Sequence, residues 1–125
     1  MQVSYRLTVE ERPAYLHAKV VGERTAANVL RFLEESYAAC VTSGRSALLL
    51  EIGFSGPSLN TSSIYNVISQ RLMDARKLHK IAYVPTGIAD PAIPYFAETV
   101  ALNRGVNVRL FQSVAAAEEW LSEEP

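Results

Sequence analysis

The segment at residues 47–52 restricts the possible folds more than any other part of the chain. It reads Ala-Leu-Leu-Leu-Glu-Ile, so its first four side chains are apolar without interruption. An apolar run this short is typical of a central β-strand that other elements cover on both faces. The sequence therefore predicts a sheet with this strand near its centre and with helices packed against it.

A helical pattern precedes this strand. Between residues 25 and 44, apolar side chains recur at intervals of three and four positions, with Thr25 suited to the N-cap and Gly44 to the C-cap. The apolar members are Val29, Leu30, Leu33, Tyr37, Cys40 and Val41. We expect a helix here that packs this face on the sheet and turns its charged face to water.

After the central strand, helices and short apolar strands alternate to the end of the chain. The expected elements are a helix at about 61–79, a strand at 81–84, a helix at 91–104, a strand at 106–111 and a helix that begins after residue 113. Asn60, Thr61 and Ser62 can each cap the first of these helices, Asp90 the second and Ser113 the last. This alternation favours parallel strands joined by helical crossovers.

The N-terminal part differs, because its side chains alternate at the period of a strand. Residues 4–9 and 14–21 both follow this pattern, and the turn signal at Glu11, Arg12 and Pro13 separates them. They predict an antiparallel hairpin. The complete order is ββαβαβαβα, an α/β fold in one domain over residues 1–125 with a mixed, mostly parallel sheet of about five strands. The acidic tail at 122–125 is expected to fray.

Composition and charge limit the classes of function. The chain is 49% hydrophobic and carries a formal net charge of −1, so it has material for a core and no overall field that attracts nucleic acid. No signal peptide pattern and no apolar stretch of membrane-spanning length is visible, which predicts a soluble cytoplasmic protein. The single cysteine, Cys40, excludes an internal disulfide, and its position on the apolar helix face predicts a buried thiol.

The order of elements, together with three short segments, resembles a known family. These segments are residues 47–52, the helix start at 60–63, and the closing residues Val108, Arg109, Leu110 and Phe111 with Trp120 and Leu121 nine and ten positions after Phe111. The pattern is similar to the sporulation anti-anti-sigma-factor-like family, the STAS-like domains that are also grouped with the SEC14 lipid-transfer fold. The resemblance implies a bacterial-type, non-enzymatic regulatory module that binds a protein partner.

In switch-type members of that family, an Asp-Ser-Ser/Thr-Gly segment opens a helix, and its hydroxyl is phosphorylated by a partner kinase. The matching positions here are Asn60, Thr61, Ser62 and Ser63, so asparagine replaces the aspartate and serine replaces the glycine. The resemblance implies phosphorylation at Thr61 or Ser62. The alternative is that these hydroxyls only cap the helix.

Two loops, at residues 53–60 and 85–90, follow neighbouring expected strands. If these strands are parallel, both loops lie at the carboxyl edge of the sheet, where open α/β sheets bind ligands. The residues expected to frame a partner surface or an apolar pocket are Phe54, Ser55, Ile88, Ile93 and Tyr95. The second hypothesis for the function is therefore binding of a small apolar or lipid-like ligand beneath these loops.

Other chemistry has weaker support. Ser55 would need His17 or His79 as a base for serine hydrolase chemistry, and nothing in the sequence brings either close to it. The same two histidines lack the further ligands that a metal site needs, and no cofactor is expected. The basic side chains near the end of the helix expected at about 61–79 are predicted to be solvated there; they are Arg71, Arg76, Lys77 and Lys80, with His79. Self-association through an edge strand of the hairpin is also open.

Overall fold

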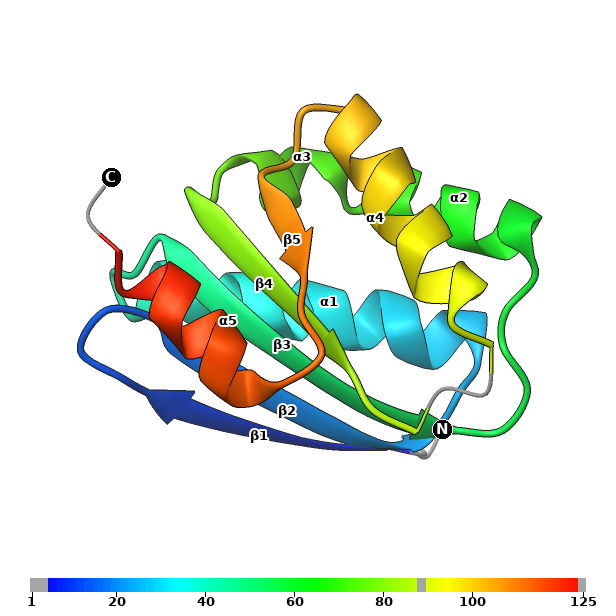
Figure 1. Ribbon diagram of the computed structural model, residues 1–125, viewed down its shortest axis with the longest axis horizontal. Helices are drawn as coiled ribbons and strands as arrows, with labels where there is room; N and C mark the ends of the chain where they lie inside the picture. The colour runs from blue at the N-terminus through cyan, green and yellow to red at the C-terminus, as the bar shows by residue number, and fades with distance from the viewer. Residues whose placement is uncertain (1–4, 88–89, 124–125) are drawn as a thin grey trace.

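The computed structural model describes residues 5–87 and 90–123. The chain opens with two strands, and helices and strands then alternate, with two successive helices between the third and fourth strands, as Figure 1 shows. The strands are β1 (Tyr5–Glu11), β2 (Leu16–Glu23), β3 (Ala47–Ser55), β4 (Lys80–Pro85) and β5 (Val108–Leu110). The helices are α1 (Ala26–Thr42), α2 (Thr61–Gln70), α3 (Leu72–Arg76), α4 (Ala92–Asn103) and α5 (Val114–Leu121).

The five strands form one sheet in the order β1-β2-β3-β4-β5. The β1 and β2 strands are antiparallel, and the three other neighbouring pairs are parallel. The predicted α/β class, the mixed sheet and the central place of the apolar strand are confirmed. Leu50 of β3 lies opposite Ala18 of β2 and Tyr83 of β4, so the carboxyl ends of β2, β3 and β4 reach the same edge.

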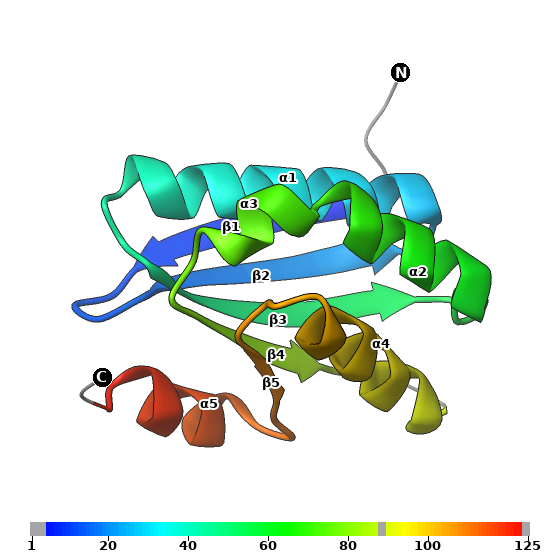
Figure 2. The same cartoon turned by 90° about the horizontal axis from the view of Figure 1, so that it is seen from above.

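Side chains of β3 alternate between two cores of unequal size. Leu48, Leu50 and Phe54 join the larger core beneath α1 and its neighbouring helices. Ala47 and Leu49 join the smaller core, which α5 covers. Figure 2 shows α1 and α5 on opposite sides of the sheet. This two-sided burial is the physical reason for the unbroken apolar run in the sequence.

The inner face of α1 is rotated from the predicted one. Phe32 and Ser36 are fully buried, whereas Val41 is 59% exposed. Successive helix residues differ by about 100°, so a face centred between Phe32 and Leu33 includes Cys40 and leaves Val41 in water. The prediction that Val41 faces the core is wrong.

The loop predicted at residues 53–60 begins later than expected. β3 continues to Ser55, because Gly53, Phe54 and Ser55 still pair with Val21, Gly22 and Glu23 of β2. Gly53 lies where neighbouring segments of the chain approach closely, and not in a turn. A Cβ there would lie 3.1 Å from the Thr86 Oγ1 and 3.2 Å from the Val20 carbonyl oxygen.

The helix predicted up to His79 is divided into α2 and α3 at Arg71. The Nε of Arg71 donates to the Leu30 carbonyl oxygen at 3.2 Å, and its Nη1 lies 3.3 Å from Glu34 Oε2. Both partners belong to α1, so this side chain ties the junction of α2 and α3 to that helix.

Cys40 is fully buried, as predicted. Its Sγ donates to the Arg45 carbonyl oxygen at 3.2 Å, and burial raises the pKa of the thiol to about 11, although the Arg45 charge opposes the shift. We expect a thiol-specific reagent at about pH 8 to label the folded protein at least 100-fold more slowly than the protein in concentrated guanidinium chloride. Equal labelling rates in the two solvents would show that the thiol is accessible in the fold.

Candidate functional site

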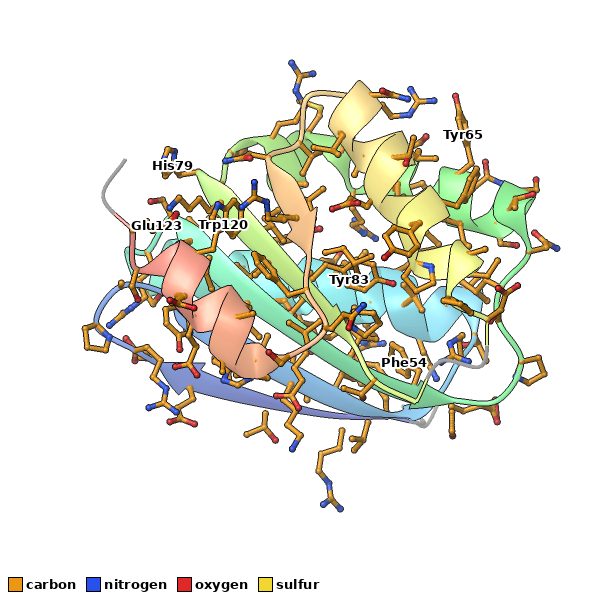
Figure 3. The ribbon with its side chains drawn as sticks, in the orientation of Figure 1. Phe54, Tyr65, His79, Tyr83, Trp120 and Glu123 are labelled. Carbon is orange, nitrogen blue, oxygen red and sulfur yellow. The ribbon has the colours of Figure 1, made fainter. Side chains whose placement is uncertain are left out.

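An apolar cavity of about 160 Å³ lies between the sheet and the helices α1, α2 and α4. The alternation of β3 and β4 sends Leu50 and Ile81 to this side, where they meet side chains of the helices. The deeply buried wall includes Leu33, Leu50, Val67, Ile81 and Val106. Figure 3 shows Phe54 and Tyr83 in the region enclosed by the sheet and these helices, whereas Tyr65 points outward from α2.

The entrance lies toward the carboxyl edge of the sheet. Ser58, in the loop after β3, is exposed, while Arg24, Tyr83 and Ile93 are half-buried, and all four line the cavity. Arg24 joins β2 to α1, and Ile93 is in the first turn of α4. The cavity therefore opens at the edge where parallel α/β sheets usually bind ligands.

Arg24 is fixed at this entrance by backbone carbonyls. Its Nη2 donates to the Phe54 carbonyl oxygen at 2.6 Å, and its Nη1 donates to the Gly56 carbonyl oxygen. Within residues 5–87 and 90–123, no carboxylate lies at ion-pair distance from Arg24. The guanidinium is thus held in place but not neutralised.

Two tyrosine side chains add hydroxyl groups to the apolar lining. Burial raises the pKa of Tyr83 to about 12, and the Arg24 charge opposes this shift. Burial and the Asp74 charge also raise the pKa of Tyr37, which is 7% exposed. Neither hydroxyl has a hydrogen-bond partner in the described part of the chain. Both remain protonated donors at neutral pH.

The structure brings only some of the predicted site residues to the cavity. Phe54 lines the cavity but is 2% exposed, so it is a wall of the core and not a surface residue. Ile93 also lines the cavity, whereas Tyr95, 55% exposed, borders a separate and more open depression. Ser55 is exposed and donates to the Gly22 carbonyl oxygen at 3.2 Å. Ile88 lies outside the described residues.

The sequence patterns did not identify Arg24, Tyr37 and Tyr83 as residues of the candidate site. Tyr83 had a usable signal, because it stands two positions after Ile81 in a strand and must share its face. Tyr37 belonged to the predicted apolar face of the first helix. Arg24 gave no signal, because only the folded chain brings it to Phe54 and Gly56.

A second feature, the N-terminus of α2, lies beside the entrance. The Asn60 Oδ1 accepts a hydrogen bond from the Ser63 N–H at 2.8 Å, so Asn60 is the cap among the three candidates. Thr61 and Ser62 are exposed, and their hydroxyls make no hydrogen bond within the described residues. Leu59 and Ile64, on either side of this segment, line the cavity.

Comparisons with known proteins identify the architecture. No family model matches the chain, and no curated protein matches it. Two of the solved structures that match cover nearly the whole chain. The crystal structure of an anti-sigma factor antagonist from Mycobacterium paratuberculosis is 16% identical, with a TM-score of 0.60 and 98% of each chain covered.

The second is an uncharacterized protein from the DUF3478 family of Shewanella loihica PV-4, described as having a SpoIIAA-like fold. It is 16% identical with a TM-score of 0.59, and the match covers 94% of this chain and 93% of that one. The chain has this SpoIIAA-like, STAS-type fold. The architecture that the sequence resemblance implied is confirmed.

In this SpoIIAA-like fold, Ser55 has no histidine within reach. His17 lies opposite Leu49, six residues before Ser55 on β3, which corresponds to about 20 Å along a strand. The backbone N–H of His79 donates to the Ser46 carbonyl oxygen at the far end of β3. General-base catalysis requires hydrogen-bond distance, so neither histidine can activate Ser55 in this geometry.

The described residues contain no group of three or more His, Cys, Asp or Glu side chains placed to hold a metal ion. Among the helices in this same part of the chain, none has the length and apolar character needed to cross a bilayer.

Lys80 of the SpoIIAA-like fold is not the solvated helix-end residue that the sequence predicted. It is the first residue of β4 and is 8% exposed. Its Nζ donates to the Trp120 carbonyl oxygen at 2.7 Å and to the Glu123 carbonyl oxygen at 3.3 Å, at the C-terminal end of α5. The prediction was wrong because Lys80 and Trp120 are 40 positions apart, so local spacing gives no sign of this contact between β4 and α5.

Proposed function

We propose that this protein is a non-enzymatic, cytoplasmic regulatory module that binds a protein partner through the surface around the N-terminus of α2. The observation that carries the proposal is the pair of exposed hydroxyls of Thr61 and Ser62, which capping does not use. One of the similar solved structures is named as an anti-sigma factor antagonist, and that name supports a regulatory role for this chain.

Phosphorylation at Thr61 or Ser62 is the proposed switch. A phosphate there carries close to two negative charges and meets the positive end of the helix dipole. The first turn of α2 contains no acidic residue, so no neighbouring carboxylate in that turn opposes the added charge. The modification would stabilise the helix start and add negative charge to the surface that a partner meets.

The test begins with phosphopeptide mapping of the protein purified from its own host, where we expect a phosphate on Thr61 or Ser62. Partner retention is then compared for Ser62→Ala, Ser62→Glu and the control Ser69→Glu, which adds the same charge to an exposed position at the other end of α2. We expect Ser62→Glu to change the partner Kd by about tenfold or more and Ser69→Glu to leave it unchanged. If no phosphate is found on Thr61 or Ser62 and Ser62→Glu leaves the partner Kd unchanged, the proposed switch is contradicted.

A second candidate function is binding of a small apolar ligand in the cavity. Its volume of about 160 Å³ is close to that of an engineered cavity of about 150 Å³ that stays dry and binds benzene. This volume favours an apolar body of about ring size over a full-length lipid chain. Leu59 and Ile64 line the cavity and flank Thr61 and Ser62, so the two candidate sites share one helix start.

A further inference from the structure

We propose that the cavity binds a small monocarboxylic acid, with the apolar body inside and the carboxylate at the entrance against Arg24 and the Tyr83 hydroxyl. This inference names the ligand class for the second candidate function and rests on it. The cavity supplies the size and apolar lining, and the polar groups at its entrance supply the selection for charge.

Arg24 is the first of these polar groups. A half-buried cation normally has a charged partner, yet Arg24 has only carbonyl oxygens among its described partners. A guanidinium has five N–H donors, and the two hydrogen bonds to the Phe54 and Gly56 carbonyl oxygens leave donors for a carboxylate. Because the Phe54 and Gly56 carbonyls already fix the group, little conformational entropy is lost when a ligand binds.

The other charged side chains of the lining are already engaged. Arg71 Nη1 lies 3.3 Å from Glu34 Oε2, so that cation is compensated. The Glu98 Oε2 accepts a hydrogen bond from the Leu110 backbone N–H at 2.7 Å, beside β5. Among the charged groups that line the cavity, Arg24 is therefore the one available to an anion.

Tyr83 supplies the second contact at the entrance. Its hydroxyl remains protonated at neutral pH, because burial raises the pKa of Tyr83 to about 12, and Tyr83 lines the same cavity as Arg24. A carboxylate has two oxygens with several acceptor positions, so it can accept hydrogen bonds from the guanidinium and the phenol together. Tyr37, buried in the wall, offers a further unpartnered hydroxyl to polar substituents on the body of the ligand.

The test uses benzoate and neutral benzyl alcohol, two probes of similar size, in titrations followed by the backbone amide NMR signals of the full chain. We expect benzoate to bind about tenfold more tightly than benzyl alcohol, since a hydrogen bond to a charged group is worth about that factor. Both sets of shifts should centre on the cavity residues.

Variants then assign the selectivity. Arg24→Met should weaken benzoate binding about tenfold and change benzyl alcohol binding less than about twofold. Arg6→Met, which removes an exposed arginine from β1, is the matched control and should change neither. Because Arg24 also holds two carbonyls, Tyr83→Phe is the second variant. It removes one hydroxyl and should weaken benzoate about threefold or more.

Ala97→Phe tests whether the probes bind in the cavity at all, apart from their charge. The introduced phenylalanine ring should fill the cavity and abolish binding of both probes. Equal affinities for the two probes, or unchanged selectivity in both Arg24→Met and Tyr83→Phe, would overturn the carboxylic acid assignment while the cavity remained a ligand site. If neither benzoate nor benzyl alcohol bound, both the acid assignment and the second candidate function would be overturned.

Discussion

Replacing Phe54 by alanine is expected to lower the free energy of unfolding by about 3–5 kcal/mol. The ring is 2% exposed and packs edge-to-face against Phe32 at 5.9 Å and Tyr5 at 6.2 Å between ring centroids. The substitution removes this buried area and two aromatic contacts. It also enlarges the adjacent cavity, which leaves more of the wall without packing partners.

Urea denaturation followed by circular dichroism measures this loss. Tyr65→Ala is the control, because that ring is 46% exposed and its described aromatic contact is with the Arg104 guanidinium at 4.3 Å. The control should cost less than about 1 kcal/mol. If Phe54→Ala cost no more than Tyr65→Ala, the placement of Phe54 in the core would be wrong.

Replacing Lys80 by methionine is expected to lower the free energy of unfolding by about 2 kcal/mol. Methionine retains most of the volume but cannot donate to the Trp120 and Glu123 carbonyl oxygens. The ammonium also lies 5.2 Å from the centroid of the Trp120 ring. Its loss removes a cation from the negative end of the α5 dipole and one hydrogen bond from each carbonyl, although the Glu123 N–H still donates to the Trp120 carbonyl oxygen at 3.3 Å.

Lys77→Met is the matched control, because Lys77 is near in sequence but its side chain is 66% exposed and pairs loosely with Asp74 at 3.8 Å. This change should stay within about 0.5 kcal/mol. Hydrogen exchange should show faster exchange of the α5 amides in Lys80→Met and not in Lys77→Met. Equal stabilities of the two variants would mean that the buried ammonium does not hold α5 on the sheet.

The local patterns of the sequence determined the class of fold. The apolar run at 47–52 required cover on both faces, and the structure provides it through the α1 side and through α5. Alternation in the first strands and helical stripes later gave the order of elements. The period of a strand or helix is a property of neighbouring residues, so it can be read without knowledge of the fold.

The sequence also identified the edge of the sheet at which the candidate site lies, because parallel strands end together. It could not supply the site itself. Arg24 meets Phe54 and Gly56 across 30 and 32 positions, and Lys80 meets Trp120 across 40. Such pairs have no signature in local spacing.

What only the tertiary structure decided is which side chains are buried together and which polar groups remain without partners. The fold places Phe54 in the core and exposes Val41 to water. It also leaves the Arg24 guanidinium, which lines the same cavity as Tyr83, with carbonyl oxygens as its described partners. Burial and charge compensation depend on elements that are distant in the chain. They therefore follow from the packing of the sheet and helices and not from the order of residues within any one of them.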